Sequence, residues 1–327
     1  MSTKPGAGHV AWPLPKASHE GTYSSGGFFV GNPDLGYGIS PQSRVWTSVL
    51  KTPDGSIIYD VKYSINQYGL RQGSSPLKPI SQKAIFFFGD SYTFGEGVND
   101  EDTLPQQFSR ASGIRVINFG VPGYGPHQML RMLEINGAKA VESNDPLTIV
   151  YSLLPSEHIV RAAGRAAWDK TGPHYEVIDG TPKYMGPFRP STLLPRILLH
   201  SRIYSELLDQ RIRHFTTDND RQRLLAILLR ARDLSVSRYH ASFFVVLWEG
   251  SAYYPQDDTN EKWIAQTLEQ NGVPTLRLSG LIPGSAELDG FRFPLDRHPT
   301  AKAYALAANG LKALVNAKLL SSLSDLN

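Results

Sequence analysis

The sequence contains no cysteine among its 327 residues. Disulfide bonds, thiolate metal sites and cysteine nucleophiles are therefore excluded. A chain without cysteine is compatible with oxidising and reducing compartments alike, so this absence leaves the location of the protein open.

Long apolar runs are also missing. Residues 1–21 contain no apolar run of the roughly 7–15 residues found in a secretory signal peptide. Nowhere do about 20 apolar residues follow one another, so no transmembrane segment is expected. If an export signal has been removed, we expect a periplasmic or secreted protein, and otherwise a cytoplasmic one.

Concentrated positive charge is absent too. The net charge is only +3, and no block of five or six Lys or Arg residues occurs. A nucleic-acid partner is therefore not favoured. Neither a Gly-x-Ser-x-Gly elbow nor a Walker-type phosphate loop occurs, which weakens α/β-hydrolase and nucleotide-binding interpretations. The oligomeric state stays open.

What the chain does have is an ordinary globular composition, with 41% hydrophobic and 19% charged residues. Its length suits one large α/β domain, or a domain of about 200–250 residues with an appendage. Residues 1–26 are rich in Gly, Pro, Ser and Lys and predict a flexible tail. Residues 27–80 predict a small β-rich extension, with strands around a turn at Pro53-Asp54-Gly55.

From residue 81 to 327, apolar strands alternate with helical segments. Runs that are apolar on both faces are typical of a parallel sheet covered on both sides. An insertion at about 166–200, with a hairpin at 178–181, interrupts this pattern. The predicted fold is a three-layer, flavodoxin-like α/β sandwich with a mostly parallel five-stranded sheet. We expect strands at 85–88, 115–119, 147–154, 242–248 and 274–278, and helices at 103–111, 126–137, 202–215, 219–237, 261–271 and 300–319.

Three motifs follow predicted strands. They are Gly89-Asp90-Ser91, the glycine-rich loop from Asn118 to Gly125, and Asp296-Arg297-His298-Pro299 before the last helix. The carboxyl ends of parallel strands meet at one edge of the sheet, so these motifs should converge.

Their residue types are those of nucleophilic catalysis. A serine becomes a good nucleophile when a histidine takes its proton and a carboxylate orients that histidine. Ser91, His298 and Asp296 supply these groups. Pro299 suits the first position of a helix. Backbone N–H groups at Ser91 and in the glycine loop could hold an oxyanion, and each donor typically stabilises the transition state by about 2.7–4 kcal/mol.

The stretches GDSYTFGEG, NFGVPGYG and DRHPTAKAYALAANGL resemble blocks I, II and V of the SGNH, or GDSL-type, serine hydrolases, over residues 84–318. This resemblance implies a flavodoxin-like fold and ester hydrolysis through an acyl-serine, with no metal or organic cofactor. It implies Ser91 as nucleophile, His298 as base and Asp296 as its partner. It also implies an oxyanion hole formed by Ser91 and Gly123, because the family's loop tends to read Asn-x-x-x-x-Gly.

Two positions depart from the family's pattern. Its third block usually ends in Gly-x-Asn-Asp, whose Asn donates to the oxyanion, whereas this strand runs into Pro155-Ser156-Glu157-His158. Either Ser156 or a neighbour replaces the asparagine, or the hole has two donors. The Asp-x-His spacing is also shorter than the usual Asp-x-x-His, which leaves Asp289 and Glu287 as competing carboxylates.

Several other residues have structural interpretations that compete with functional ones. Glu157-His158 could suggest a metal site, but such a pair is more often capping or solvated. His127 and His174 are isolated, and His174 fits the surface better than the cleft. Asn118 suits a brace within its loop. Three aromatic residues either line an acyl or sugar pocket or simply pack: Tyr92, Phe94 and Tyr124.

The functional hypothesis is a serine esterase that removes acyl groups, acetyl above all, from a carbohydrate or another small ester. One alternative is an O-acyltransferase in which residues 166–200 and the β-rich extension hold a sugar acceptor. Another is a non-catalytic carbohydrate-binding relative, because the block III asparagine is missing.

Overall fold

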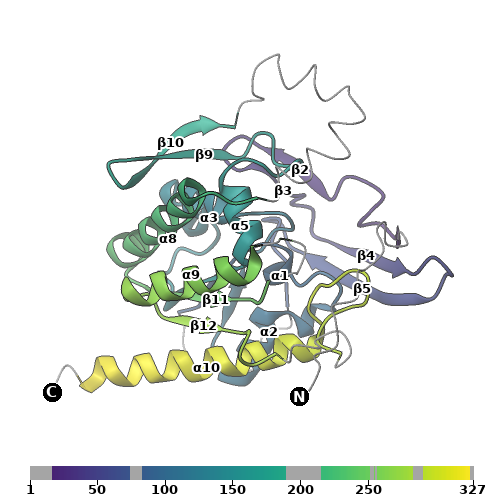
Figure 1. Cartoon of the computed structure of the whole chain (residues 1–327). Helices are drawn as coiled ribbons and strands as arrows, with labels where there is room; N and C mark the ends of the chain where they lie inside the picture. The colour runs from purple at the N-terminus through teal and green to yellow at the C-terminus, as the bar shows by residue number, and fades with distance from the viewer. Residues whose placement is uncertain are drawn as a thin grey trace, which may run out of the picture.

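The computed structural model describes residues 17–73, 83–188, 215–250, 254, 256–282 and 290–324, with only the backbone of 319–324 (Figure 1). Nearly all of the helix predicted at 202–215 lies outside these residues. The competing carboxylates Glu287 and Asp289 lie outside them as well.

The central sheet has the predicted flavodoxin-like topology. Every neighbouring pair of strands is parallel, in the order β7-β6-β8-β11-β12. Numbered along the chain this is 2-1-3-4-5, the doubly wound order in which sites lie outside the carboxyl ends of the strands. The strands are β6 (Ile85–Phe88), β7 (Val116–Asn118), β8 (Thr148–Leu153), β11 (Ser242–Leu247) and β12 (Thr275–Arg277).

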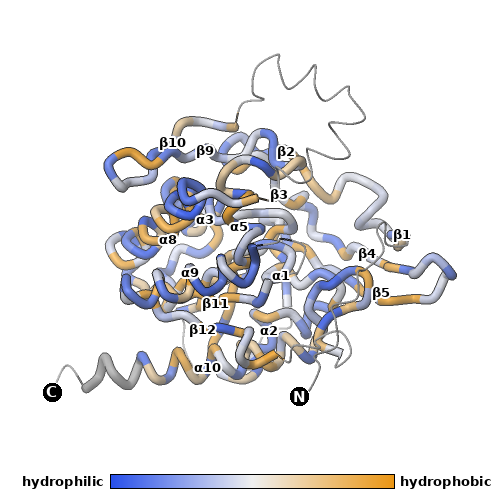
Figure 2. Tube along the Cα trace, viewed as in Figure 1, coloured by the Kyte–Doolittle hydropathy of each residue, from blue (hydrophilic) through white to orange (hydrophobic). Residues whose placement is uncertain are grey.

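Helices cover both faces of this sheet, because its strands are apolar on both sides. Phe86 and Phe88 pack in one core with α3 (Pro126–Glu134), α5 (Pro155–Ala162), α8 (Asp218–Tyr239) and α9 (Asp257–Gln270). Ile85 and Phe87 pack in the other with α2 (Leu104–Ser112) and α10 (Ala301–Ser324). In Figure 2 β11 is largely orange, whereas α8 and α9 mix orange and blue, as expected of helices with one buried side.

Three α-helices among the described residues are additions to the predicted set, the first of them the short α1 (Ser91–Phe94) after β6. The helix α5 begins at Pro155 directly after β8, and the short α4 (Gly137–Val141) follows α3. The predicted hairpin in the insertion is present as β9 (Pro173–Ile178) and β10 (Thr181–Pro187), joined by a turn at Asp179-Gly180.

The β-rich extension is built on a long antiparallel hairpin of β4 (Arg44–Lys51) and β5 (Ile57–Ile65), whose turn is the predicted Pro53-Asp54-Gly55. The hairpin β2 (Phe29–Asn32) and β3 (Gly36–Ile39) lies before it. Residues 18–20, predicted to be tail, instead form β1 (Ser18–Glu20) and pair with β4. All three side chains are exposed, so backbone pairing and the surface pair of Glu20 with Lys51 make this strand, and the sequence carries no apolar pattern for it.

The extension shares a core with the turn after β6. Phe28, Trp46 and Tyr63 are buried with Phe94. Arg71 crosses the junction: its guanidinium pairs with Asp100 at 3.0 Å and donates to backbone carbonyls of the segment after β6. These are the carbonyls of Phe94, Gly95 and Val98.

Replacing Arg71 with methionine should destabilise the fold strongly. The side chain is buried, and its removal takes the cationic partner from the Asp100 carboxylate and a donor from several carbonyls, so we expect about 3–5 kcal/mol less free energy of unfolding. Urea denaturation measures this. Lys51→Met, which breaks the surface pair with Glu20, should cost less than about 1 kcal/mol. Equal losses in the two variants would contradict this account of the junction.

Candidate active site

The turn after β6 presents Ser91 at the start of a helix. Gly89 has φ +153°, and a Cβ there would lie 2.3 Å from Thr93 Oγ1, so only glycine fits. Asp90 then caps the short helix α1 (Ser91–Phe94) by accepting a hydrogen bond from the Tyr92 amide at 3.0 Å. Ser91 is therefore the first helical residue, with its amide at the electropositive end.

Beneath the nucleophile, the fully buried Asp90 pairs with Arg161, which is buried except where it lines the cleft. Its Oδ2 accepts from Arg161 Nη1 at 2.6 Å and lies 3.3 Å from His158 Nε2. Burial alone would raise the pKa of Asp90, but the Arg161 guanidinium and the His158 hydrogen bond hold it far below its usual range. Asp90 therefore stays ionised and keeps the turn fixed.

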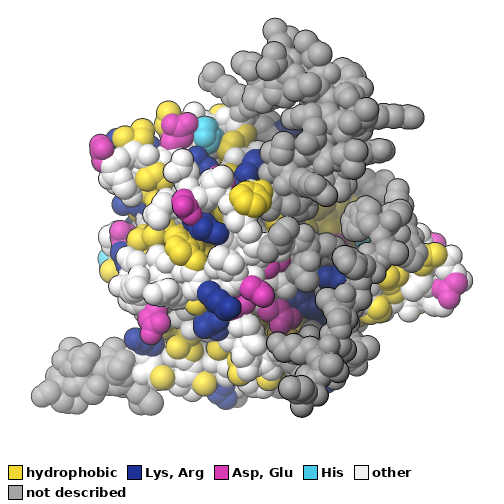
Figure 3. All heavy atoms as spheres, viewed as in Figure 1, with side chains coloured by type: hydrophobic (Ala, Val, Ile, Leu, Met, Phe, Trp, Pro, Cys, Tyr) yellow, Lys and Arg dark blue, Asp and Glu magenta, His cyan; other side chains and the backbone are white. Residues whose placement is uncertain are grey.

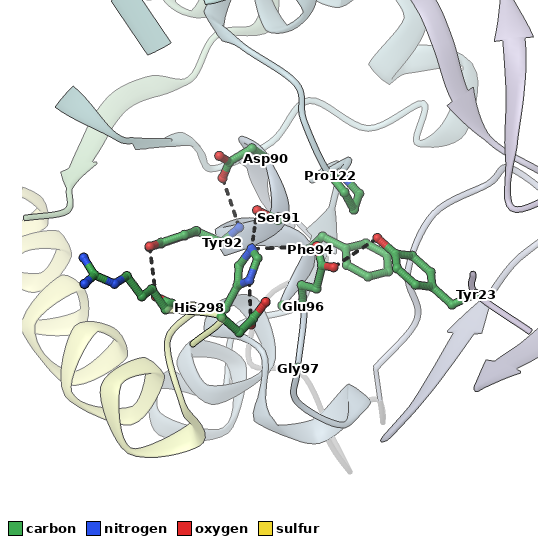
Figure 4. A network of polar contacts seen from close by, with 12 residues as sticks. Tyr23, Asp90, Ser91, Tyr92, Phe94, Glu96, Gly97, Pro122 and His298 are labelled. Atoms are coloured by element: carbon green, nitrogen blue, oxygen red, sulfur yellow. Dashed lines mark hydrogen bonds and ion pairs between the residues drawn. The ribbon is translucent and has the colours of Figure 1, made fainter. Parts of the chain in front are cut away.

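The three predicted catalytic residues are brought together. His298 Nε2 lies 2.8 Å from Ser91 Oγ, and His298 Nδ1 lies 2.8 Å from Asp296 Oδ2. Figure 4 shows His298 pointing at Ser91 from the loop before α10. This is the hydrogen-bonded chain of nucleophile, base and orienting carboxylate that acyl transfer through serine requires.

A tight loop makes the short Asp-x-His spacing possible. Leu295 and Arg297 both adopt φ +64°, the left-handed region, and this folds Asp296 back onto His298. Arg292 Nη1 and Tyr92 Oη donate hydrogen bonds to the carbonyl oxygen of Arg297 at 3.1 and 3.2 Å.

The prediction that Pro299 opens the helix is wrong. α10 begins two residues later, because Pro299 bridges to Arg292 in the same loop.

Two carboxylates surround the base. Burial alone would lower the pKa of His298, but Asp296 and Glu96 outweigh it and raise the pKa to about 9. Burial would raise the pKa of Asp296, yet His298 keeps it below the usual value. The resting site therefore holds an imidazolium at neutral pH.

The glycine loop between β7 and α3 is held by three side chains. Tyr37 Oη donates to the carbonyl of Pro122 at 2.9 Å, Trp168 Nε1 to that of Gly123 at 3.1 Å, and Arg161 to that of Tyr124 at 2.8 Å. Gly123 has φ +84°. Because the N–H and C=O of a trans peptide point in opposite directions, Tyr37 fixes the direction of the Gly123 N–H.

Asn118 is the predicted brace of this loop. Its side chain donates to the Thr93 carbonyl and accepts from the Gly120 amide, both at 2.9 Å. Gly120 itself has no room for a Cβ, which would meet Phe94 N at 2.4 Å. The loop and the nucleophile turn are thus packed directly on each other.

Ser156 does not take the place of the missing block III asparagine. It is fully buried: its backbone amide donates a hydrogen bond to Asp257 Oδ1 at 3.3 Å, and its hydroxyl accepts one from Asn260 Nδ2 at 2.8 Å. Glu157 and Arg161, paired at 2.7 Å, line the cleft instead. His158, read from sequence as capping or solvated, is buried against Asp90.

The cleft around Ser91 has a volume of about 230 Å³ and a wall that mixes charged side chains with apolar and aromatic ones. Tyr92, Pro122 and Trp168 are its larger apolar or aromatic members. Phe94 and Tyr124, candidate pocket residues from sequence, pack in the core shared with the extension. The charged side chains of the wall are Glu96, Glu157, Asp296, Arg161 and Arg297.

Two other histidines considered from the sequence, His127 and His174, do not line this cleft. His127 is buried with Nε2 2.8 Å from Asp169, and His174 is half-exposed in β9. Within the described ranges, no group of three potential metal ligands occurs and no helix is long and apolar enough to cross a membrane. On the face drawn in Figure 3, acidic and basic side chains are interspersed.

Sequence reasoning missed the positioning residues Arg161, Arg292 and Glu96. Glu96 lies inside the GDSYTFGEG stretch, so its closeness to Ser91 was a usable signal. Arg161 has a local partner in Glu157, but the carboxylates that place Arg161 and Arg292 in the site, Asp90 and Glu249, lie 71 and 43 residues away along the chain.

No family model and no curated protein matches the chain. Thirty-two chains of solved structures do. A lipolytic protein of the G-D-S-L family from Desulfitobacterium hafniense is 12% identical, with TM-score 0.44, over 71% of this chain and 99% of its own. An acetyl xylan esterase from Butyrivibrio proteoclasticus is 14% identical, with TM-score 0.43, and the match covers 74% of this chain and 65% of the esterase. A salicylyl-acyltransferase from a tetracycline biosynthetic pathway is 14% identical, with TM-score 0.39, and the match covers 73% of this chain and 57% of the acyltransferase. At such identities and scores none of them identifies a substrate or a reaction for this chain.

Removing either end of the Ser91–His298 pair should abolish ester hydrolysis. We expect Ser91→Ala and His298→Ala to lower kcat by about 10³-fold or more, and Asp296→Asn to leave a small residual activity. Steady-state kinetics with an activated ester measures this, and circular dichroism checks the fold. An Asp296→Ala variant as active as the parent would instead assign the orienting role to Asp289 or Glu287.

The pH profile should reflect the raised pKa of His298. A base must be neutral to accept the Ser91 proton, and a raised pKa keeps it protonated to higher pH. We therefore expect kcat/KM to rise about tenfold per pH unit and to level off near pH 9. Rates are corrected with Ser91→Ala for spontaneous hydrolysis. An apparent pKa at or below 7 would contradict this charge arrangement.

Proposed function

We propose that the protein is a serine acyl hydrolase that cleaves carboxylic esters through an acyl-serine. The observation that carries the proposal is the unbroken hydrogen-bonded chain Ser91–His298–Asp296, with Ser91 at a helix N-terminus on the carboxyl edge of the sheet. Buried, mutually hydrogen-bonded groups of these types are arranged for nucleophilic catalysis.

In the proposed reaction, Ser91 Oγ attacks the ester carbonyl while its proton passes to His298 Nε2. The carbonyl oxygen becomes an oxyanion that accepts from the amides of Ser91 and Gly123. Collapse breaks the bond to the alcohol, which leaves with the proton from His298. Water then attacks the acyl-serine, giving its proton to His298, and the carboxylic acid is released as Ser91 is restored.

The cleft favours a short acyl group on a polar alcohol. Its volume of about 230 Å³ suits a short acyl chain better than a long one, and five of the described residues that line it carry a charged side chain. Buried carboxylates and guanidinium groups favour a substrate that supplies hydroxyl groups. Acetyl esters of a sugar or another polyol satisfy both conditions.

The O-acyltransferase alternative uses the same acyl-serine, with a sugar hydroxyl in place of water. A non-catalytic relative is less favoured, because an assembled Ser91–His298 hydrogen bond has no need to persist in a binding module.

Hydrolysis of p-nitrophenyl acetate tests the proposed function. The parent protein should release p-nitrophenol with turnover and should be labelled once by a serine-reactive phosphonate, whereas Ser91→Ala should do neither. A series of p-nitrophenyl esters should show falling kcat/KM beyond short acyl chains.

Added sugar separates the two enzymatic alternatives. If acetyl moves mainly to the sugar rather than to water, the transferase is the function. If intact Ser91 is neither labelled nor acylated by any short ester, the hydrolase proposal fails.

A further inference from the structure

A second carboxylate lies beside the catalytic base. Glu96 Oε2 is 3.7 Å from His298 Nε2, on the side of the ring that faces Ser91, while Asp296 occupies Nδ1 on the other side. A separation of 3.7 Å is too long for a hydrogen bond. Glu96 is therefore near the reacting nitrogen without being its main partner, Ser91 Oγ at 2.8 Å.

The position of Glu96 is fixed by the β-rich extension. Tyr23 Oη donates to Glu96 Oε1 at 3.2 Å, and the Tyr23 ring packs edge-on against Phe28 and Tyr63 at 4.6 and 5.4 Å. Tyr63 Oη in turn accepts from the Gly97 amide at 3.0 Å. Figure 4 shows Tyr23 reaching Glu96 from the opposite side to His298.

Glu96 thus has one oxygen occupied and the other beside the cleft. The residue is 9% exposed and lines the cleft with Ser91 and His298. A carboxylate oxygen in so buried a position is stabilised by any donor that the substrate brings.

The location of Oε2 decides which half of the substrate it meets. The leaving alcohol must take its proton from His298 Nε2, so its oxygen approaches that nitrogen. An acceptor 3.7 Å from Nε2 is within reach of a hydroxyl on the carbon adjacent to the one that bears the ester oxygen. The acyl half lies toward the oxyanion donors instead.

Building on the proposed function, we propose that Glu96, oriented by Tyr23, recognises the alcohol half of the substrate by accepting a hydrogen bond from a hydroxyl adjacent to the ester. The protein then selects esters of vicinal diols, such as glycerol or a sugar, over esters of alcohols with a single hydroxyl.

The same carboxylate affects the base. Burial raises the pKa of Glu96, and its charge, when present, helps to keep His298 protonated. Removing the charge of Glu96 should therefore shift the rising limb of the pH profile to lower pH. Among the described residues, the other titratable or charged groups that face His298, or act on its carboxylate partners, include Asp296, Arg297, Asp90, Tyr92, Glu157, His19, Tyr59, Tyr63 and Tyr304.

Two acetyl esters that differ only in the alcohol test the proposal: glycerol monoacetate and ethyl acetate. We expect the parent to prefer glycerol monoacetate in kcat/KM. Glu96→Ala should reduce this preference about tenfold, the size expected for a hydrogen bond to a charged group. Glu96→Gln keeps an acceptor oxygen and should retain part of the preference for glycerol monoacetate. Both variants should shift the rising limb of the pH profile to lower pH.

Tyr23→Phe removes only the hydroxyl that orients Glu96, and it should also lower the preference for glycerol monoacetate. This variant keeps the test available if a Glu96 variant folds poorly. Tyr59→Phe is the matched control, because it removes another buried phenol hydroxyl of the extension that has no hydrogen-bond partner among the described residues. It should leave the ratio unchanged.

An unchanged ratio in Glu96→Ala and Tyr23→Phe, with hydrolysis intact, would overturn this inference and leave the esterase standing. If the parent hydrolyses neither acetate and Ser91 is not labelled, the proposed function and this inference fall together.

Discussion

The buried ion pair between Arg161 and Asp90 is the interaction on which the rest of the site depends. One guanidinium nitrogen joins Asp90 at 2.6 Å and the Tyr124 carbonyl at 2.8 Å, while the other holds Glu157. The nucleophile turn, the glycine loop and α5 are thereby fixed to a single cation. Since a buried charge without its partner is costly by about 3–5 kcal/mol, these three segments are constrained to one arrangement.

A second constraint comes from the extension, which reaches the site through two tyrosines. Tyr37, in β3, orients the peptide before Gly123, and Tyr23, in the turn between β1 and β2, orients Glu96, so segments outside the central sheet shape both sides of the reacting groups. Their shared core with Phe94 makes this coupling rigid. The part of the chain that looks like an appendage in sequence thus contributes to the chemistry proposed for Ser91.

The parallel sheet and the triad were predictable because both follow from local patterns. Apolar runs such as Ile85–Phe88 fix the strands, and the topology brings their carboxyl ends together, so Ser91 and His298 meet although they are 207 positions apart in the sequence. Arg161 and the strand Ser18–Glu20 were not predictable. A buried arginine is defined by distant partners, and an exposed strand of three residues is held by backbone pairing that leaves no hydrophobic period.

The central claim is that Ser91 and Gly123 form the oxyanion hole beside His298, with no contribution from Ser156. A crystal structure of the protein with a phosphonate ester bound to Ser91 tests it most directly. We expect one phosphonyl oxygen about 3 Å from the amides of both Ser91 and Gly123. An oxygen directed away from Gly123, or a donor contributed by Ser156, would contradict the account.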